Sequence, residues 1–204
     1  MSAEPLTLDD IADQRAYERQ RDEFRRQVIA TKKLRRVSVG PVITLMFESR
    51  LTVRFQIQEM ARAEKMATDH QIQRELDAYN RLLPGPGELS ATLFLELRSE
   101  EELRTWLPRL VGIERSVELR IGPDGSGVSV TSIPEQEHQA HLTRPTTTAA
   151  VHYLRFELSD RQVEAFATGP ARLAVNHPRY PDGLPGTWLE DATRVELSAD
   201  LAGR

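Results

Sequence analysis

The sequence predicts an α+β protein in which N-terminal helices pack on a mostly antiparallel β-sheet formed by the C-terminal part. Two observations favour this class. Residues 11–82 contain one Gly-Pro pair and are mostly typical of helices, apart from a short apolar run at 42–48, whereas apolar and polar residues alternate in several segments after residue 90. The run Pro84-Gly85-Pro86-Gly87 separates the two patterns. We expect a single domain over residues 1–204, with a helical part (1–83) and a β-rich part (88–204), because the helices are too sparsely apolar to fold alone.

The first helix is expected over about residues 11–34. Asp9 and Asp10 precede it, and acidic groups suit the positive end of a helix dipole. The segment has no glycine or proline, and its few apolar residues at helical spacing are Tyr17, Phe24, Val28 and Ile29. So narrow a stripe predicts a helix that packs by one edge.

The next segments are a buried strand and two more helices. Gly40-Pro41 breaks the chain, and the apolar run 42–48 then suits a strand or another tightly buried segment. Residues 51–57 alternate like a strand, but Val53, Ile57 and Met60 also fit helical spacing. We favour a helix over about 49–66 with Ser49 as its N-cap. A further helix is expected over 69–82.

Five period-two segments predict the strands, at 91–97, 116–122, 127–133, 150–158 and 171–177. Asp124-Gly125 between two of them is typical of a hairpin turn. Short helices are expected to begin at Ser99, where Glu102 completes a capping-box pattern, and at Ser159. Residues 189–201 favour a closing helix, with a strand around 193–195 as the alternative.

Composition limits the class of protein. The 204 residues are 39% hydrophobic and 28% charged, as in ordinary globular chains, and the net charge is −4. There is no overall reason to expect nucleic acid or an anionic membrane as partner. The acidic start resembles no signal peptide, and no apolar run approaches the roughly 20 residues that span a bilayer.

The chain has no cysteine, which excludes disulfides, thiolate nucleophiles and cysteine-ligated clusters within it. Together with the acidic start, this predicts a cytoplasmic protein. The phosphate-loop, dinucleotide, nucleophile-elbow and His-Glu-x-x-His motifs are also absent. The sequence does not decide whether the protein is an enzyme, and it names no cofactor.

Carboxylates and carboxamides among apolar neighbours form the first candidate ligand-binding set. Its members are Glu48, Gln56, Gln58, Glu59 and Glu64, and Glu59 and Glu64 are the candidate metal ligands. Glu59 and Glu64 are five residues apart, so they do not share one clean helix face. The alternative is that these side chains cap elements and satisfy buried backbone groups.

Histidines form the second set. His138 and His141, with Glu135, would make a partial metal site on a helix, but Pro134 and Pro145 bracket them and favour a loop.

His152 falls in an expected strand, whereas His177 falls at a strand end beside Arg179 and Tyr180. A histidine at a strand end can act as a base or a ligand near neutral pH. The alternative is a turn-stabilising histidine beside a packed tyrosine.

A basic cluster forms the candidate partner-binding set. Six cations fall within twelve residues, namely Arg25, Arg26, Lys32, Lys33, Arg35 and Arg36. They could hold an anion or an acidic partner. Aromatic residues are not interleaved among them, so nucleic acid is not expected. The alternative is a solvated helix face that Asp22 and Glu23 partly neutralise.

The order of several short motifs resembles an uncharacterised bacterial family, domain of unknown function 3501. They include Arg35-Arg36-Val37, Gly40-Pro41, 44–48, Gln56-x-Gln58-Glu59-Met60, Arg62, Glu64, Glu75-Leu76, Tyr79-Asn80, 89–92, 151–156 and His177-Pro178-x-Tyr180. The similarity covers nearly the whole chain. The sequence departs from the family pattern at Ser49, where asparagine is usual, and around His138 and His141, where the family varies.

The resemblance implies a role beside rubrerythrin-like and iron–sulfur proteins in a bacterial response to peroxide or oxygen. We expect an accessory or interaction protein that docks on such a redox partner, whose cysteines would hold any iron–sulfur cluster. The alternative is an iron- or manganese-binding protein, or a metal-dependent enzyme, that gathers Glu48, Glu59 and Glu64 with His152 or His177. A third possibility is a small-ligand site near His177 and Tyr180.

Overall fold

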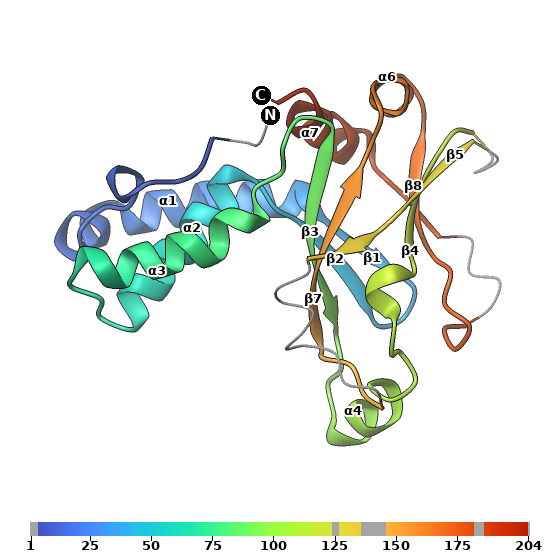
Figure 1. Ribbon diagram of the computed structural model, residues 1–204, viewed down its shortest axis with the longest axis horizontal. Helices are drawn as coiled ribbons and strands as arrows, with labels where there is room; N and C mark the ends of the chain where they lie inside the picture. Colours follow the sequence, from blue (N-terminus) through green and yellow to red (C-terminus); the bar gives the residue numbers. More distant parts are fainter. Residues whose placement is uncertain (1–3, 124–126, 136–145, 182–185, 204) are drawn as a thin grey trace.

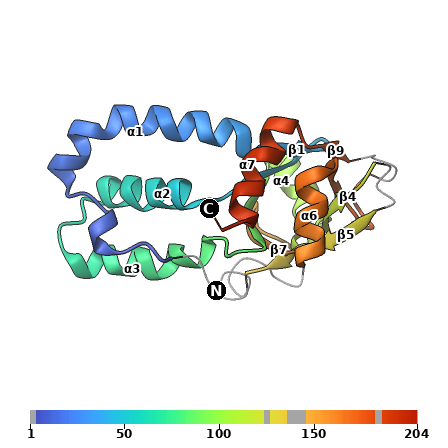
Figure 2. The ribbon, with the colours of Figure 1, turned by 90° about the horizontal axis from the view of Figure 1, so that it is seen from above.

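The fold is a helical arm that projects from a body of two β-sheets (Figure 1). The computed structural model describes residues 4–123, 127–135, 146–181 and 186–203. In both views the arm runs away from the sheets, and α7 (Asp191–Leu201) lies where the two meet (Figure 2).

Three helices form the arm, namely α1 (Gln14–Arg35), α2 (Arg50–Ala63) and α3 (Asp69–Tyr79), with the short 3-10 turns η1 (Leu8–Asp10) and η2 (Asn80–Leu82). A side chain caps the start of each long helix: Asp13, Ser49 and Thr68 each accept a backbone N–H from the first turn. Residues 51–58 are therefore helical, and the favoured interpretation is confirmed. Burial of Val53 and Ile57 on one face explains why the helical spacing prevails over the alternation.

One sheet contains five strands in the order β1-β2-β3-β7-β6. Their bounds are β1 (Arg36–Val39), β2 (Ile43–Phe47), β3 (Glu88–Leu95), β7 (Val151–Glu157) and β6 (Ile133–Pro134). The other sheet has the order β5-β4-β8-β9, with β5 (Val128–Thr131), β4 (Val117–Ile121), β8 (Ala171–Val175) and β9 (Thr187–Trp188). Every pairing is antiparallel.

The antiparallel α+β class is thus confirmed, but the strands divide into two sheets where one was expected. The short strands β1, β6 and β9 were not predicted, since two to four residues give too little alternation to detect. The Asp124-Gly125 turn lies outside the described residues.

The main core lies between the sheets. Leu89, Ala91, Leu93 and Leu95 of β3 alternate toward it, and Leu119 and Leu173 face them from the second sheet. Helices α6 (Asp160–Thr168) and α7 add Phe166, Leu197 and Leu201 to the same core. At the opposite end of the sheets lie α4 (Glu100–Trp106), which begins at Ser99 as expected, and the turn η3 (Ile113–Arg115) (Figure 1).

The arm has a second, smaller core formed by Leu6, Val53, Ile57, Leu76, Leu82 and Leu83. Tyr153 of β7 packs against it and connects it to the five-stranded sheet. This core is small, and polar contacts between the helices add to the order of the arm. Among the described residues, no helix is both long and apolar enough to cross a membrane.

Candidate functional site

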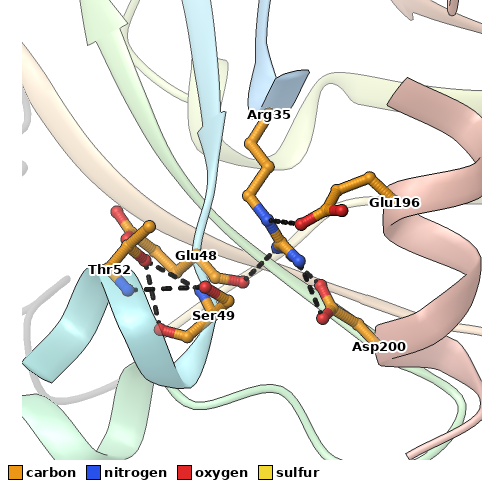
Figure 3. A network of polar contacts seen from close by, with 6 residues as sticks. All are labelled: Arg35, Glu48, Ser49, Thr52, Glu196 and Asp200. Atoms are coloured by element: carbon orange, nitrogen blue, oxygen red, sulfur yellow. Dashed lines mark hydrogen bonds and ion pairs between the residues drawn. The ribbon is translucent and has the colours of Figure 1, made fainter. Parts of the chain in front are cut away.

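A buried ion-pair network joins the end of α1 to α7 (Figure 3). Arg35 is 3% exposed, and its guanidinium donates to both carboxylate oxygens of Asp200 at 2.7 and 2.9 Å. Its Nε donates to Glu196 at 2.9 Å, and Nη1 also donates to the backbone oxygen of Glu48 at 3.2 Å. Arg35 therefore fastens the arm to the body from the inside, and it is not available to a partner.

The Glu48 carboxylate is buried at the junction of β2, β3 and α2. It accepts the hydroxyl of Thr92 on one oxygen and the hydroxyl of Thr52 on the other, each at 2.6 Å. The Thr52 hydroxyl oxygen also lies 3.1 Å from the Ser49 carbonyl, and the backbone N–H of Ser49 donates to that hydroxyl (Figure 3). Both Glu48 oxygens thus bind side-chain hydroxyls of the chain itself.

Glu59 links α2 to α1. Arg21 donates to its two oxygens at 2.8 Å each, and the Tyr17 hydroxyl donates at 2.6 Å. The hydrogen bonds from Arg21 lower the pKa of the Glu59 carboxyl to about 2, although partial burial opposes them. Burial, followed by the hydrogen bond to Glu59, raises the pKa of Tyr17. This carboxylate is occupied by a cation of the chain.

Carboxamides hold the N-terminal segment 6–12 against the arm. The Gln58 side chain accepts the Ala12 N–H at 3.0 Å and donates to the Ala12 carbonyl at 2.9 Å. Asn80 makes the same reciprocal pair with Leu6, at 2.8 and 2.9 Å. Asn80 was not predicted as a site residue, although it follows Tyr79 in a motif of the family resemblance.

The candidate metal ligands are not brought together. Glu59 is paired with Arg21, whereas Glu64 is exposed at the C-cap of α2, and Gln56 is half-buried in the middle of that helix. Within the described ranges, no group of three or more His, Cys, Asp or Glu residues could hold a metal ion. The residues His138 and His141 lie outside the described part of the chain.

His152 is buried between the sheets. Its Nε2 lies 2.8 Å from the Thr148 hydroxyl and 3.0 Å from the Ala149 carbonyl. Burial lowers the pKa of His152, and the nearby Glu114 carboxylate opposes that shift. A neutral imidazole that bonds to its own loop fits a structural role.

His177 and Tyr180 are both anchored in the body. His177 donates from Nε2 to the Val111 carbonyl at 3.0 Å and accepts the Arg179 N–H on Nδ1 at 3.2 Å. The Tyr180 hydroxyl donates to the Val39 carbonyl at 2.7 Å, and burial raises the pKa of this tyrosine to about 12. The His177 imidazole is thus held in place beside a surface hollow of about 540 Å³.

The basic cluster does not form one surface, which corrects the expectation. Arg35 is buried, Arg36 pairs with Glu96 and lies over the Phe94 ring, and Arg26 pairs with Glu23. Lys32 lies over the Phe55 ring, 5.5 Å from its centroid. Because helical spacing sends neighbouring residues in different directions, only Arg25 and Lys33 remain as exposed cations with no ion pair in the described part.

A different basic surface is present. Arg15, Arg19, Arg25, Ile29 and Lys33 are exposed and share one face of α1, which we call the outer edge. Arg15 and Arg19 were not among the predicted residues, although the helical period that places them with Arg25 could have identified them.

The fold and these contacts define an α+β protein of two antiparallel sheets with a helical arm, in which most candidate polar groups bind the chain itself. A family model described as "Protein of unknown function (DUF3501)" matches residues 5–201. The chain belongs to this family, so the resemblance is confirmed. Its association with rubrerythrin-like and iron–sulfur proteins stays a prediction.

Among solved structures, the chain is similar to a novel protein of unknown function from Burkholderia pseudomallei K96243. The sequences are 38% identical, and the match covers 97% of this chain and 100% of that one with a TM-score of 0.86. No curated protein matches.

Proposed function

We propose that this protein is an accessory protein that binds an acidic surface of a redox partner through the outer edge of α1. The observation that carries the proposal is a concentration of exposed positive charge on one helix face of an acidic chain.

The charge of the outer edge is positive after internal pairing. Glu18 and Glu23 on the same helix are paired with Arg62 and Arg26. Four cations of the outer edge have no ion pair among the described residues, namely Arg15, Arg19, Arg25 and Lys33. Asp22 is the acidic residue that remains beside them, in a protein whose net charge is −4. Such a face attracts an acidic surface and speeds association with it.

Ile29 lies between the positively charged side chains of the outer edge. Its side chain is 55% exposed, and Arg25 and Lys33 lie one turn before and one turn after it. Single exposed apolar residues are common, but an apolar centre with a charged rim is also the usual anatomy of a protein interface. Ile29 would supply the contact, and the cations would supply the orientation.

The arm is suited to presenting this face. α1 has 22 residues and is therefore about 33 Å long. Its opposite side is held by Glu59 and by Arg35, at the two ends of the helix. Because the helix is fixed from behind, its outer edge can bind without reorganisation of the arm.

The family resemblance suggests the kind of partner, a rubrerythrin-like or iron–sulfur redox protein of the bacterial cytoplasm. Any cysteine-ligated cluster would belong to that partner, since this chain has no cysteine. The role we propose is thus docking, with the electron-transfer chemistry in the partner.

The test is binding to a purified rubrerythrin-like or iron–sulfur protein encoded beside a gene of this family, measured by calorimetry at low and high salt. We expect binding that weakens as salt rises, and a loss of about tenfold or more in the Arg25→Glu/Lys33→Glu variant. The matched control is Arg98→Glu/Arg161→Glu, which makes the same charge change at exposed positions outside the arm.

Ile29→Gln separates the apolar contribution from the charges. This variant should bind more weakly while keeping the salt dependence of the wild type. Binding that is independent of salt, or that both charge-reversal variants weaken equally, would contradict docking by the outer edge.

A further inference from the structure

A second feature of the molecule lies away from the arm, at the α4 end of the sheets. There the turn after α4 meets the segment that follows β8 and encloses a hollow of about 540 Å³. Its lining consists of Pro108, Arg109, Val111, Thr146, His177, Pro178 and Arg179. The volume is within the range of small-molecule sites.

The walls of the hollow are fixed to each other. The His177 imidazole bridges them, because Nε2 donates to Val111 on one wall and Nδ1 accepts the N–H of Arg179 on the other. Tyr180 ties the same segment to β1 through Val39 and packs against Trp106, with ring centroids 6.2 Å apart. A hollow with such walls is formed before any ligand arrives.

Among the described lining residues, the charged side chains are two arginines and none is a carboxylate. Arg109 and Arg179 are exposed, and neither has an ion pair in the described part of the chain. The two guanidinium groups therefore make this hollow a local positive site.

Arg109 is also held in place. Its guanidinium lies over the Trp106 ring, 5.0 Å from the centroid, and Trp106 in turn packs against Tyr180. Stacking on an aromatic face restricts a long side chain while leaving its N–H donors for a ligand. Thr146 adds a hydroxyl to the same lining.

We propose that this hollow binds a small ligand through an oxyanion group, carboxylate or phosphate, with Arg109 and Arg179 as the ligand-binding residues. A planar guanidinium fork matches both groups in bidentate geometry, and two forks at one hollow favour a compact anion over a single monodentate contact. The side chain of His177 positions the walls and leaves recognition to the arginines. This site is independent of the outer edge of α1.

The experiment uses Trp106 as the reporter. The chain has two tryptophans, so Trp188→Phe leaves Trp106 as the only one. Inorganic phosphate and succinate are titrated separately into this background at constant ionic strength, with sodium chloride as the reference. We expect a saturable change in Trp106 fluorescence with at least one of the two anions and none with chloride.

The arginine variants decide the assignment. Arg179→Gln should weaken the affinity about tenfold or more, since a charged hydrogen-bond donor is lost without touching Trp106. Arg109→Gln should weaken it similarly when measured by calorimetry, because this change also alters the fluorescence baseline. The control is Arg104→Gln, which removes an exposed arginine of α4 that does not line the hollow.

The titrations distinguish a phosphate site, a carboxylate site and the absence of an anion site. Saturation with one anion only supports the site and assigns it to a phosphate or a carboxylate ligand. Absence of saturation with both anions, or binding that neither Arg179→Gln nor Arg109→Gln weakens, would overturn the proposal. Failure of the docking test on α1 would leave this result unaffected, because the two surfaces share no residue.

Discussion

Arg35 donates two hydrogen bonds to Asp200, which is 165 residues away in the chain. Both side chains are nearly inaccessible, with 4% and 8% exposed. A buried bidentate pair favours one geometry, because separating the two side chains would leave each as an uncompensated buried charge. The helical arm and the sheets are therefore held in one relative arrangement by this contact, which Glu196 and the Glu48 backbone complete.

The first prediction concerns the stability of this pair. Replacing one partner, as in Arg35→Met or Asp200→Leu, should lower the free energy of unfolding by about 3–5 kcal/mol. The double variant should lose less than the sum of the two, because neither Arg35 nor Asp200 is then left as an unpaired buried charge. Urea denaturation of the four proteins measures the difference.

The control for this cycle is Arg104→Met, which breaks the exposed pair with Glu100. It should change the free energy of unfolding by less than about 1 kcal/mol. A loss of the same size at Arg35 and Arg104 would show that the buried pair has no special weight.

The contacts of Arg35 show why the sequence predicts the helices and strands better than the contacts of the candidate site. Local patterns predict α2 and α4 well, since Ser49 and Ser99 cap them and the spacing of Val53 and Ile57 is visible within a few residues. Arg35 looks like one more cation of a basic cluster, because its partners lie at the other end of the chain. The pairing of distant segments is a property of the tertiary structure that periodicity does not encode.

The partners of the candidate carboxylates could not be predicted for the same reason, because they lie on other elements of the fold. The sequence marks Glu48 and Glu59 as polar groups among apolar neighbours, and in the structure threonines, a tyrosine and an arginine bind them. Composition around a carboxylate predicts that it needs a partner. It does not distinguish a partner within the chain from a metal ion or a ligand.

The second prediction concerns pH and Glu59. Its pKa in the folded state is lowered to about 2, so the folded protein holds a carboxylate that the unfolded chain protonates near pH 4.5. This contribution to stability is fully present above about pH 4.5 and is lost as the pH falls toward 2. Because the pair with Arg21 is partly exposed, we expect about 1–2 kcal/mol.

Glu59→Gln tests this relation by removing the titrating group. The difference in free energy of unfolding between wild type and variant, measured in urea from pH 6 to pH 3, should shrink as the pH falls. A difference that stays constant over this range would show that Glu59 titrates normally in the folded protein.

The third prediction concerns the N-terminal segment held by the two carboxamides. Gln58→Leu removes the acceptor of the Ala12 amide, and Asn80→Ala removes the acceptor of the Leu6 amide. Each variant should raise hydrogen exchange about tenfold or more at its own amide, because local opening no longer breaks a hydrogen bond. NMR of the backbone amides measures both rates.

The two variants act as controls for each other. Gln58→Leu should affect Ala12 more than Leu6, and Asn80→Ala should do the reverse. Equal acceleration at both amides in either variant would mean that the segment opens as one unit and that the separate clamps do not act locally.

The last prediction concerns the tautomer of His177, which determines what this residue can do. Nε2 lies 3.0 Å from the Val111 carbonyl, which can only accept, and Nδ1 faces the Arg179 N–H, which can only donate. The neutral ring must therefore carry its proton on Nε2. Long-range ¹H–¹⁵N spectra of labelled protein at neutral pH should show Nε2 protonated and Nδ1 unprotonated, and a dominant Nδ1–H tautomer would contradict this geometry. In this tautomer Nδ1 is the basic nitrogen, and its lone pair already accepts the Arg179 N–H, so a general-base role for His177 would require that hydrogen bond to break. Recognition at the neighbouring hollow therefore falls to Arg109 and Arg179.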